Sequence, residues 1–144
     1  PPKGVSSLFR PDQLKEILPL GDFVVVTVPE SPYTEGMFGA TQFAFMKESS
    51  FFINIGRGST VILKDLADAL INRQIAGAGL DVFQTEPLPT DHRLWSAPGT
   101  IITPHIAGLG PYLDDRRRDL FIQNCVLFNQ GEPLKNVVDK ELWF

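Results

Sequence analysis

Hydrophobic positions recur along the chain at two spacings, one typical of strands and the other of helices. Phe23–Val28 is a continuous run of apolar and β-branched residues that ends at Pro29. Such a run predicts a strand buried on both faces of a parallel sheet. Phe51–Ile55 predicts the next strand, Ile75–Val82 predicts a third, with small residues against which a helix could pack closely, and Ile101–Thr103 predicts a short fourth one.

Segments with helical spacing separate these predicted strands. Apolar residues recur at intervals of three and four from Leu63 to Ile71, which predicts an amphipathic helix. The alternation of strands and helices indicates βαβ units, so we expect an α/β fold, a parallel sheet with helices on both faces. The other expected helices are Asp12–Leu18 (stopped by Pro19 and Gly21), Thr41–Lys47 and Leu113–Gln130, whereas Asn136–Phe144 is too short to assign.

The predicted fold directs attention to the residues that follow each strand. In open parallel sheets, ligands bind at the carboxyl ends of the strands. Two chemically useful side chains, Arg57 and His105, lie within two residues of a predicted strand end. The candidate positions in chain order are Pro29, Ser31, Gly56, Arg57, Gly58, Asp81, Glu86 and His105.

Composition narrows the possible functions. The 144 residues carry a net charge of -4, so nucleic-acid binding is not expected, and no apolar run is long enough for a membrane span. Two histidines without ligand spacing give no sign of a metal site. Cys125 is the single cysteine, expected to be a buried thiol in a reducing compartment. The chain starts at Pro1 without an initiator methionine, which suggests that it begins within a longer protein.

Three segments together resemble the D-isomer-specific 2-hydroxyacid dehydrogenases. They are Ile53–Gly58, then Gly79–Phe83 leading to Glu86–Pro89, and then Thr103–Gly108, in the family's order and at its spacing. Further similar segments are Val28–Pro29 with Ser31–Thr34, Gly131–Leu134 and Asn136–Asp139, so the resemblance extends over nearly the whole chain. Among the branches of the family, the glyoxylate and hydroxypyruvate reductases are the ones most similar to Glu86–Pro89, Leu94–Trp95 and Ile102–His105.

The resemblance implies a partial dehydrogenase. Residues 1–108 would form the C-terminal half of a Rossmann-type NAD(P)-binding domain, and residues 109–144 would be a crossover helix and tail of the substrate domain. The glycine-rich pyrophosphate loop, the residue that selects NAD or NADP, and most of the substrate domain would lie upstream. Half a sheet would expose an apolar edge and face. By itself the chain would be inactive, while the full-length enzyme would be a cytoplasmic homodimer.

The resemblance also implies a role for each site residue in reducing a small 2-keto acid with NADH or NADPH. His105 would be the acid/base, Glu86 would hold its ring and favour the protonated form, and Arg57 would pair with the substrate carboxylate and polarise the ketone. Asp81 would bind the nicotinamide carboxamide, and Gly56 and Gly108 would allow close approach of the cofactor. The expected cofactor-binding residues are Val28, Pro29, Ile55, Gly56, Arg57, Asp81, His105 and Gly108.

Each site residue also has a simpler interpretation when taken alone. Arg57 in a Gly-Arg-Gly turn would be a solvated loop residue, Glu86 an exposed acid, and His105 a structural histidine. A second hypothesis for the whole chain is a non-catalytic fragment of such an enzyme that is stable only with a partner chain. The sequence upstream of Pro1 distinguishes the two hypotheses.

Overall fold

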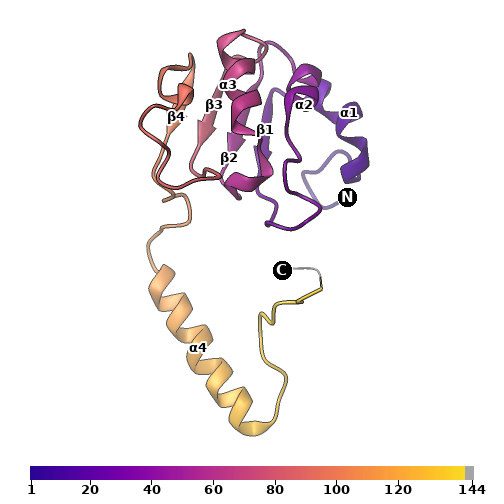
Figure 1. Cartoon of the computed structure of the whole chain (residues 1–144). Coiled ribbons are helices and arrows are strands. Elements are labelled where there is room, and N and C mark those ends of the chain that lie inside the picture. Colours follow the sequence, from indigo (N-terminus) through magenta and orange to yellow (C-terminus); the bar gives the residue numbers. More distant parts are fainter. Residues whose placement is uncertain (142–144) are drawn as a thin grey trace. The chain divides into compact units, whose positions relative to one another are not determined.

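A computed structural model describes residues 1–141 as two compact units, Pro1–His105 and a second that begins at Ile106 (Figure 1). Each unit is described by itself. The domain boundary expected after residue 108 stays a prediction about the whole enzyme. Of the unassigned segment Asn136–Phe144, residues 142–144 lie outside the described residues.

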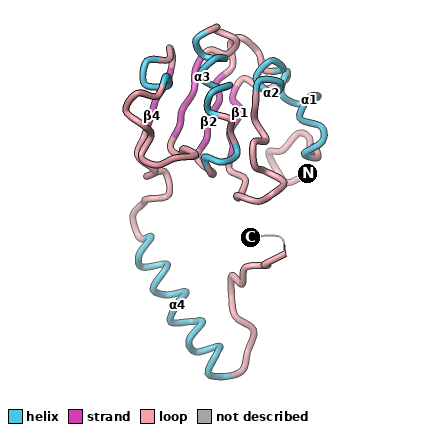
Figure 2. The backbone as a smooth tube through the Cα atoms, viewed as in Figure 1, coloured by secondary structure: helices cyan, strands magenta, loops and turns pink. Residues whose placement is uncertain are grey.

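The first unit is built on a sheet of four parallel strands in the order β1-β2-β3-β4 (Figure 2). The predicted parallel α/β fold is therefore confirmed. The hydrogen-bonded strands are shorter than the apolar runs that predicted them. Val28 and Val82 lie after the last paired residues of β1 and β3, in the loops at the carboxyl ends of these strands. The strands are β1 Phe23–Val26, β2 Phe51–Asn54, β3 Gly77–Leu80 and β4 Thr100–Ile102.

Helices α2 (Ala40–Phe45) and α3 (Leu63–Ile71) lie close to the segments predicted for them. The helix predicted at Asp12–Leu18 is instead α1 (Leu14–Ile17), with a short 3-10 turn before and after it. Pro19 lies within the second turn, where its missing amide and fixed φ suit a tight turn better than a continued α-helix.

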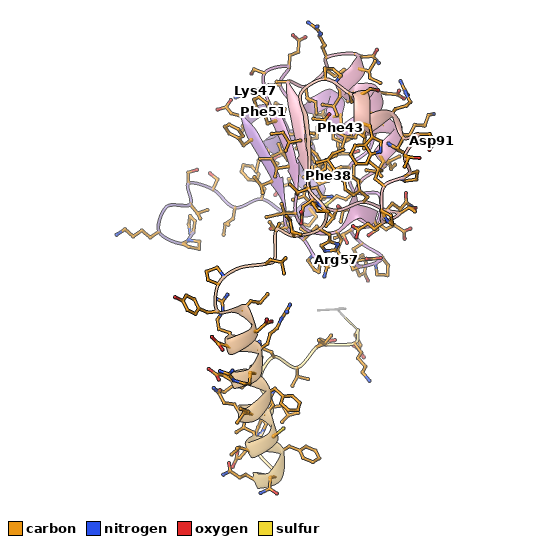
Figure 3. The ribbon with its side chains drawn as sticks, turned by 90° about the vertical axis from the view of Figure 1, so that its left-hand side faces the viewer. Phe38, Phe43, Lys47, Phe51, Arg57 and Asp91 are labelled. Carbon is orange, nitrogen blue, oxygen red and sulfur yellow. The ribbon has the colours of Figure 1, made fainter. Side chains whose placement is uncertain are left out.

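The core lies between the sheet and these helices. The Phe52 ring of β2 contacts Phe38 and Phe43, with ring centroids 5.1 and 5.2 Å apart. Leu66 and Leu70 of α3 are fully buried against the same cluster. In Figure 3, Phe38 and Phe43 lie on the helix side of the sheet, and Phe51 points away from it.

The opposite face of the sheet is exposed. Successive side chains of a strand point to opposite faces, so the residues alternating with the buried ones face outward. Phe23, Val25 and Ile101 are 66%, 52% and 70% exposed. The expectation that Phe23–Val28 is buried on both faces is therefore wrong, and so is the expectation of helices on both faces of the sheet. The expected exposure of an apolar face by half a sheet is confirmed.

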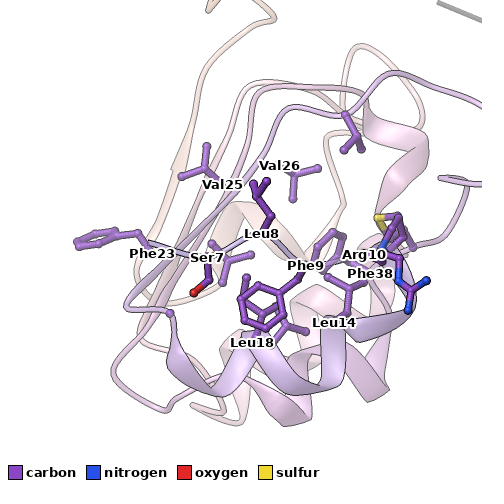
Figure 4. Close-up of a pocket in the computed structure, with 16 residues that line it drawn as sticks. Ser7, Leu8, Phe9, Arg10, Leu14, Leu18, Phe23, Val25, Val26 and Phe38 are labelled. Atoms are coloured by element: carbon purple, nitrogen blue, oxygen red, sulfur yellow. The ribbon is translucent and has the colours of Figure 1, made fainter. Parts of the chain in front are cut away.

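The outer edge of β1 is also open, because β1 pairs only with β2. A cavity of about 440 Å³ lies beside this strand, lined mainly by apolar side chains (Figure 4). Leu8 and Phe9 of the N-terminal segment face it without forming a strand, and Leu8 stays 71% exposed. The unit thus presents an unpaired edge as well as an uncovered apolar face.

The second unit contains α4 (Leu113–Gln130), as the pattern predicts. The helix ends at Gly131, whose φ of 71° is a left-handed conformation that favours glycine. Asn124 then exchanges two hydrogen bonds with the backbone of Lys135. No residue of α4 is buried within the described chain, so the expectation of a buried Cys125 is wrong: the thiol is exposed. No described helix is long and apolar enough to cross a membrane.

Two neighbouring phenylalanines test this one-sided packing. In the 144-residue chain, Phe52→Ala should lower the free energy of unfolding by about 3–5 kcal/mol, because it opens a cavity at a fully buried ring. Phe51→Ala is the matched control on the exposed face and should cost less than about 1.5 kcal/mol. Urea denaturation of both variants measures the difference, and equal losses would contradict the assignment of faces.

Candidate active site

Arg57, Glu86 and His105 meet at one cavity of about 300 Å³ at the carboxyl ends of the strands. Arg57 follows β2, Glu86 lies in the loop after β3, and His105 follows β4. Figure 3 shows Arg57 at the end of the sheet opposite Phe51. Parallel strands bring these residues together because their carboxyl ends share one edge of the sheet. The cavity is lined by Glu30, Arg57, Gly58, Ser59, Phe83, Gln84, Glu86 and His105.

The Gly56–Gly58 turn is wedged between the loops that follow β1 and β3. A Cβ atom on Gly56 would lie 2.9 Å from the carbonyl oxygen of Val28, and one on Gly58 only 1.9 Å from the carbonyl carbon of Phe83. Neither distance leaves room for a side chain. The two glycines therefore allow the backbone to approach closely on both sides of Arg57, whose side chain is exposed.

Glu86 joins the loop after β3 to His105. Its Oε1 accepts a hydrogen bond from the Phe83 amide at 2.9 Å, and its Oε2 lies 2.7 Å from His105 Nδ1. The hydrogen bond to His105 and that from the Phe83 amide lower the pKa of the Glu86 carboxyl below its ordinary value of 4.5. This carboxylate thus stabilises the fold above pH 4.5, and that contribution is lost as pH falls through the lowered pKa.

His105 adopts a left-handed backbone conformation with a φ of 55°, which is uncommon for residues other than glycine. The sharp turn follows β4 and places the ring beside Glu86. Since Nδ1 contacts Glu86, Nε2 is the nitrogen left for another molecule. The side chain is 50% exposed, so Nε2 is within reach of a ligand.

The remaining predicted cofactor residues are spread over three settings. Asp81 is buried and accepts a 2.5 Å hydrogen bond from the Thr103 hydroxyl. Pro29 accepts at its carbonyl oxygen from the Thr34 hydroxyl at 2.8 Å, which fixes the loop after β1. Ile55 is exposed at the end of β2, while Val28 lines the cavity beside β1. Gly108 belongs to the second unit.

Four cavity-lining residues were missed in the sequence, and one of them bears on ligand binding. Ser59 Oγ is buried and has no hydrogen-bond partner among the described residues. A bound polar group could satisfy it. The sequence signal was available, because Ser59 follows the Gly-Arg-Gly turn directly. Glu30, Phe83 and Gln84 likewise lie next to or near predicted strand ends.

Together these features can bind a small anion and move a proton. Arg57 offers planar donors for a carboxylate, and the His105–Glu86 pair offers a proton donor of fixed orientation. Within residues 1–141, no three histidine, cysteine or acidic side chains group as metal ligands. A parallel α/β sheet with such groups at its carboxyl edge is the arrangement of a Rossmann-type nucleotide-binding domain.

The chain belongs to the D-isomer specific 2-hydroxyacid dehydrogenase family: the model of the family's NAD-binding domain matches residues 3–107. A glyoxylate/hydroxypyruvate reductase B of Escherichia fergusonii is 39% identical over 90% of this chain and 40% of its own length. A glyoxylate/hydroxypyruvate reductase A of Photorhabdus laumondii is 34% identical over 97% and 44%. The chain thus spans less than half the length of these relatives.

Solved structures agree with the fold. The NADPH-dependent glyoxylate/hydroxypyruvate reductase of Sinorhizobium meliloti, in complex with NADP and sulfate, superposes with a TM-score of 0.83 at 34% identity, over 92% of this chain and 43% of that one. A probable 2-hydroxyacid dehydrogenase of Rhizobium etli, in complex with NADP, HEPES and tartaric acid, gives 0.83 at 31% identity, over 96% and 45%. The family and the NAD or NADP cofactor class inferred from the sequence are confirmed.

Substituting two glycines tests the wedge around Arg57. Gly58→Ala should lower the free energy of unfolding by at least about 1–3 kcal/mol, because the new Cβ would overlap the backbone at Phe83. Gly79→Ala in β3 is the matched control and should cost about 1 kcal/mol or less, since its Cβ would meet only Ile53 side-chain atoms at 3.8 and 3.9 Å. Thermal or urea unfolding of both variants measures this, and a well-tolerated Gly58→Ala would rule out the close approach.

Proposed function

We propose that the protein to which this chain belongs is an oxidoreductase that transfers a hydride between NAD(P)H and a small 2-keto acid. The observation that carries the proposal is the meeting of Arg57 with the Glu86–His105 pair at one cavity. A 2-keto acid presents a carboxylate next to a ketone. The cavity offers a carboxylate-binding cation next to a proton donor, so the two groups correspond.

The residues divide the chemistry as follows. Arg57 binds the carboxylate through its fork of donors and polarises the adjacent ketone. His105 Nε2 donates a proton to the ketone oxygen during reduction and accepts one from the hydroxyl during oxidation. Glu86 Oε2 accepts from Nδ1, which orients the ring so that Nε2 points at the substrate.

The described residues suit the nicotinamide end of the cofactor. Asp81 offers a buried carboxylate that can accept from a carboxamide, and Ser59 offers a hydroxyl that has no partner among the described residues. Val28, Pro29, Ile55, Gly56 and Gly108 complete this proposed set. When bound, the cofactor supplies the hydride. No strand-turn-helix glycine loop for the pyrophosphate occurs in the sequence, so we expect this chain alone to be inactive.

Glyoxylate and hydroxypyruvate are the proposed substrates. The relatives that bear those names are 34% and 39% identical to this chain, and a structural neighbour of the same activity supports the choice. We further propose a cytoplasmic homodimer for the whole protein. Exposed apolar residues of α4, including Phe121 and Phe128, give it surface to bury on assembly, and a single cysteine suits a reducing compartment.

A panel of 2-keto acids, each with NADH and with NADPH, tests the proposal on the full-length protein. Glyoxylate or hydroxypyruvate should be reduced fastest, and His105→Ala should lower kcat about 100- to 10,000-fold because the proton donor is gone. His92→Ala is the matched control: His92 accepts a hydrogen bond from the Leu94 amide and lies outside the cavity, so activity should persist. A folded protein that turns over no 2-keto acid would refute the assignment.

The pH dependence tests the role of Glu86. In Glu86→Gln an uncharged amide replaces the carboxylate 2.7 Å from His105 Nδ1, and a neighbouring negative charge favours the cationic form of a base. The alkaline limb of the reduction profile should therefore move to lower pH, and the acidic limb of the oxidation profile should move in the same direction. Glu30→Gln removes another carboxylate from the same cavity and should leave both limbs in place. If Glu86→Gln lowers the rates at every pH without moving either limb, Glu86 does not affect the pH dependence of the proton transfer.

A further inference from the structure

Two buried polar side chains hold the backbone of Arg57. The Arg57 carbonyl oxygen accepts hydrogen bonds from the Thr60 hydroxyl at 2.7 Å and from Asn54 Nδ2 at 3.0 Å. A third, longer bond of 3.3 Å comes from the Thr60 amide. Asn54 and Thr60 are 1% and 0% exposed, so water does not compete for these bonds.

The same two side chains close a network around the turn. Asn54 Oδ1 accepts from the Gly56 amide at 3.0 Å, and Asn54 Nδ2 also lies 3.3 Å from Thr60 Oγ1. Asn54 is itself fixed at the carboxyl end of β2, where its carbonyl oxygen accepts from the Asp81 amide at 3.0 Å. A buried polar network with all its partners satisfied is rigid, so the network ties the turn to the middle of the sheet.

Within residues 1–141, no buried side chain holds the guanidinium of Arg57. Its recorded hydrogen bond goes to the carbonyl oxygen of Gly56 at 2.7 Å, and the side chain is exposed. The direction in which Arg57 projects therefore depends on the backbone that carries it. On the other side, Gly58 rests against Phe83, whose amide binds Glu86. A shift of the turn would change the separation between Arg57 and the Glu86–His105 pair.

We propose that Asn54 and Thr60 are positioning residues that orient the Arg57 side chain toward the substrate carboxylate. This inference rests on the proposed function and adds two residues to it. Neither residue lines the cavity, so both act through Arg57. Displacing a positioned group by about 1 Å can cost on the order of 100-fold in rate, so hydrogen bonds distant from the chemistry affect catalysis.

The experiment uses the full-length protein with Thr60→Val, which removes the hydroxyl and keeps the shape, and Thr60→Ser, which restores the hydroxyl. Thr60→Val should lower kcat/KM for the 2-keto acid on the order of tenfold, mainly through KM, with the KM of the cofactor and the pH limbs unmoved. Thr60→Ser should recover most of this loss. Asn54→Ser removes the hydrogen bond from Asn54 Nδ2 to the same carbonyl oxygen and should cause the same loss of kcat/KM. This second variant tests the proposal even if Thr60→Val does not fold.

Two controls separate positioning from general damage. Ser50→Ala removes another fully buried hydroxyl, which donates to the Lys47 carbonyl at 2.7 Å near the opposite end of β2, and should leave kcat/KM unchanged. In an Arg57→Ala background, Thr60→Val should have no further effect, because the residue through which it acts is gone. Full loss in that background, or equal activity of Thr60→Val and wild type, would overturn the proposal.

Calorimetric binding of oxamate, a non-reducible analogue of a 2-keto acid, separates this inference from the proposed function. If the wild type reduces no 2-keto acid but binds oxamate through Arg57, the proposed function is wrong. The positioning role of Thr60 is then still testable, because Thr60→Val should bind oxamate more weakly than the wild type. Turnover with unchanged binding and kinetics in Thr60→Val overturns positioning alone. Absence of both turnover and oxamate binding in the wild type overturns both.

Discussion

The close approach of the Gly56–Gly58 turn to the chain at Val28 and Phe83 is the constraint on which the site depends. The parallel strands β2, β3 and β4 all end at one edge of the sheet, but this alone does not determine how far apart the loops that follow them lie. With no Cβ at Gly58, the backbone after β2 rests on the backbone after β3. Arg57 is thereby held beside the loop whose Phe83 amide and Glu86 carboxylate orient His105. The parallel sheet thus determines the edge at which the site residues lie, and the contact of Gly58 with Phe83 determines the distance between the loops that carry them.

The proposed chemistry at this edge depends on which partners each charged group has. Both Glu86 oxygens are engaged, one by an amide and the other by His105, so the carboxylate is stabilised as the anion and the imidazole is fixed by one nitrogen. Most donors of the Arg57 guanidinium have no partner among the described residues, which suits the proposed binding of a carboxylate. Rigid backbone with accessible side chains is the arrangement expected of a preorganised site.

The sequence predicted the order and type of nearly all elements because apolar periodicity reports which side chains are buried. It also predicted that Arg57, Glu86 and His105 lie together, since residues that follow parallel strands share one edge of the sheet; their roles remain a proposal. It did not predict that Phe23 and Val25 are exposed, because a continuous apolar run does not show which face of a strand the rest of the unit covers. Asn54 and Thr60 were missed as well, because hydrogen bonds to backbone carbonyls leave no spacing pattern.

The central claim is that Arg57 and His105 engage one 2-keto acid from the two sides of this cavity. A crystal structure of the full-length protein with NADP⁺ and oxamate tests it most directly. We predict that the oxamate carboxylate contacts the Arg57 guanidinium and that its amide carbonyl oxygen lies within hydrogen-bond distance of His105 Nε2, while Nδ1 stays hydrogen-bonded to Glu86. Oxamate bound away from Arg57, or with His105 turned from the carbonyl oxygen, would contradict it.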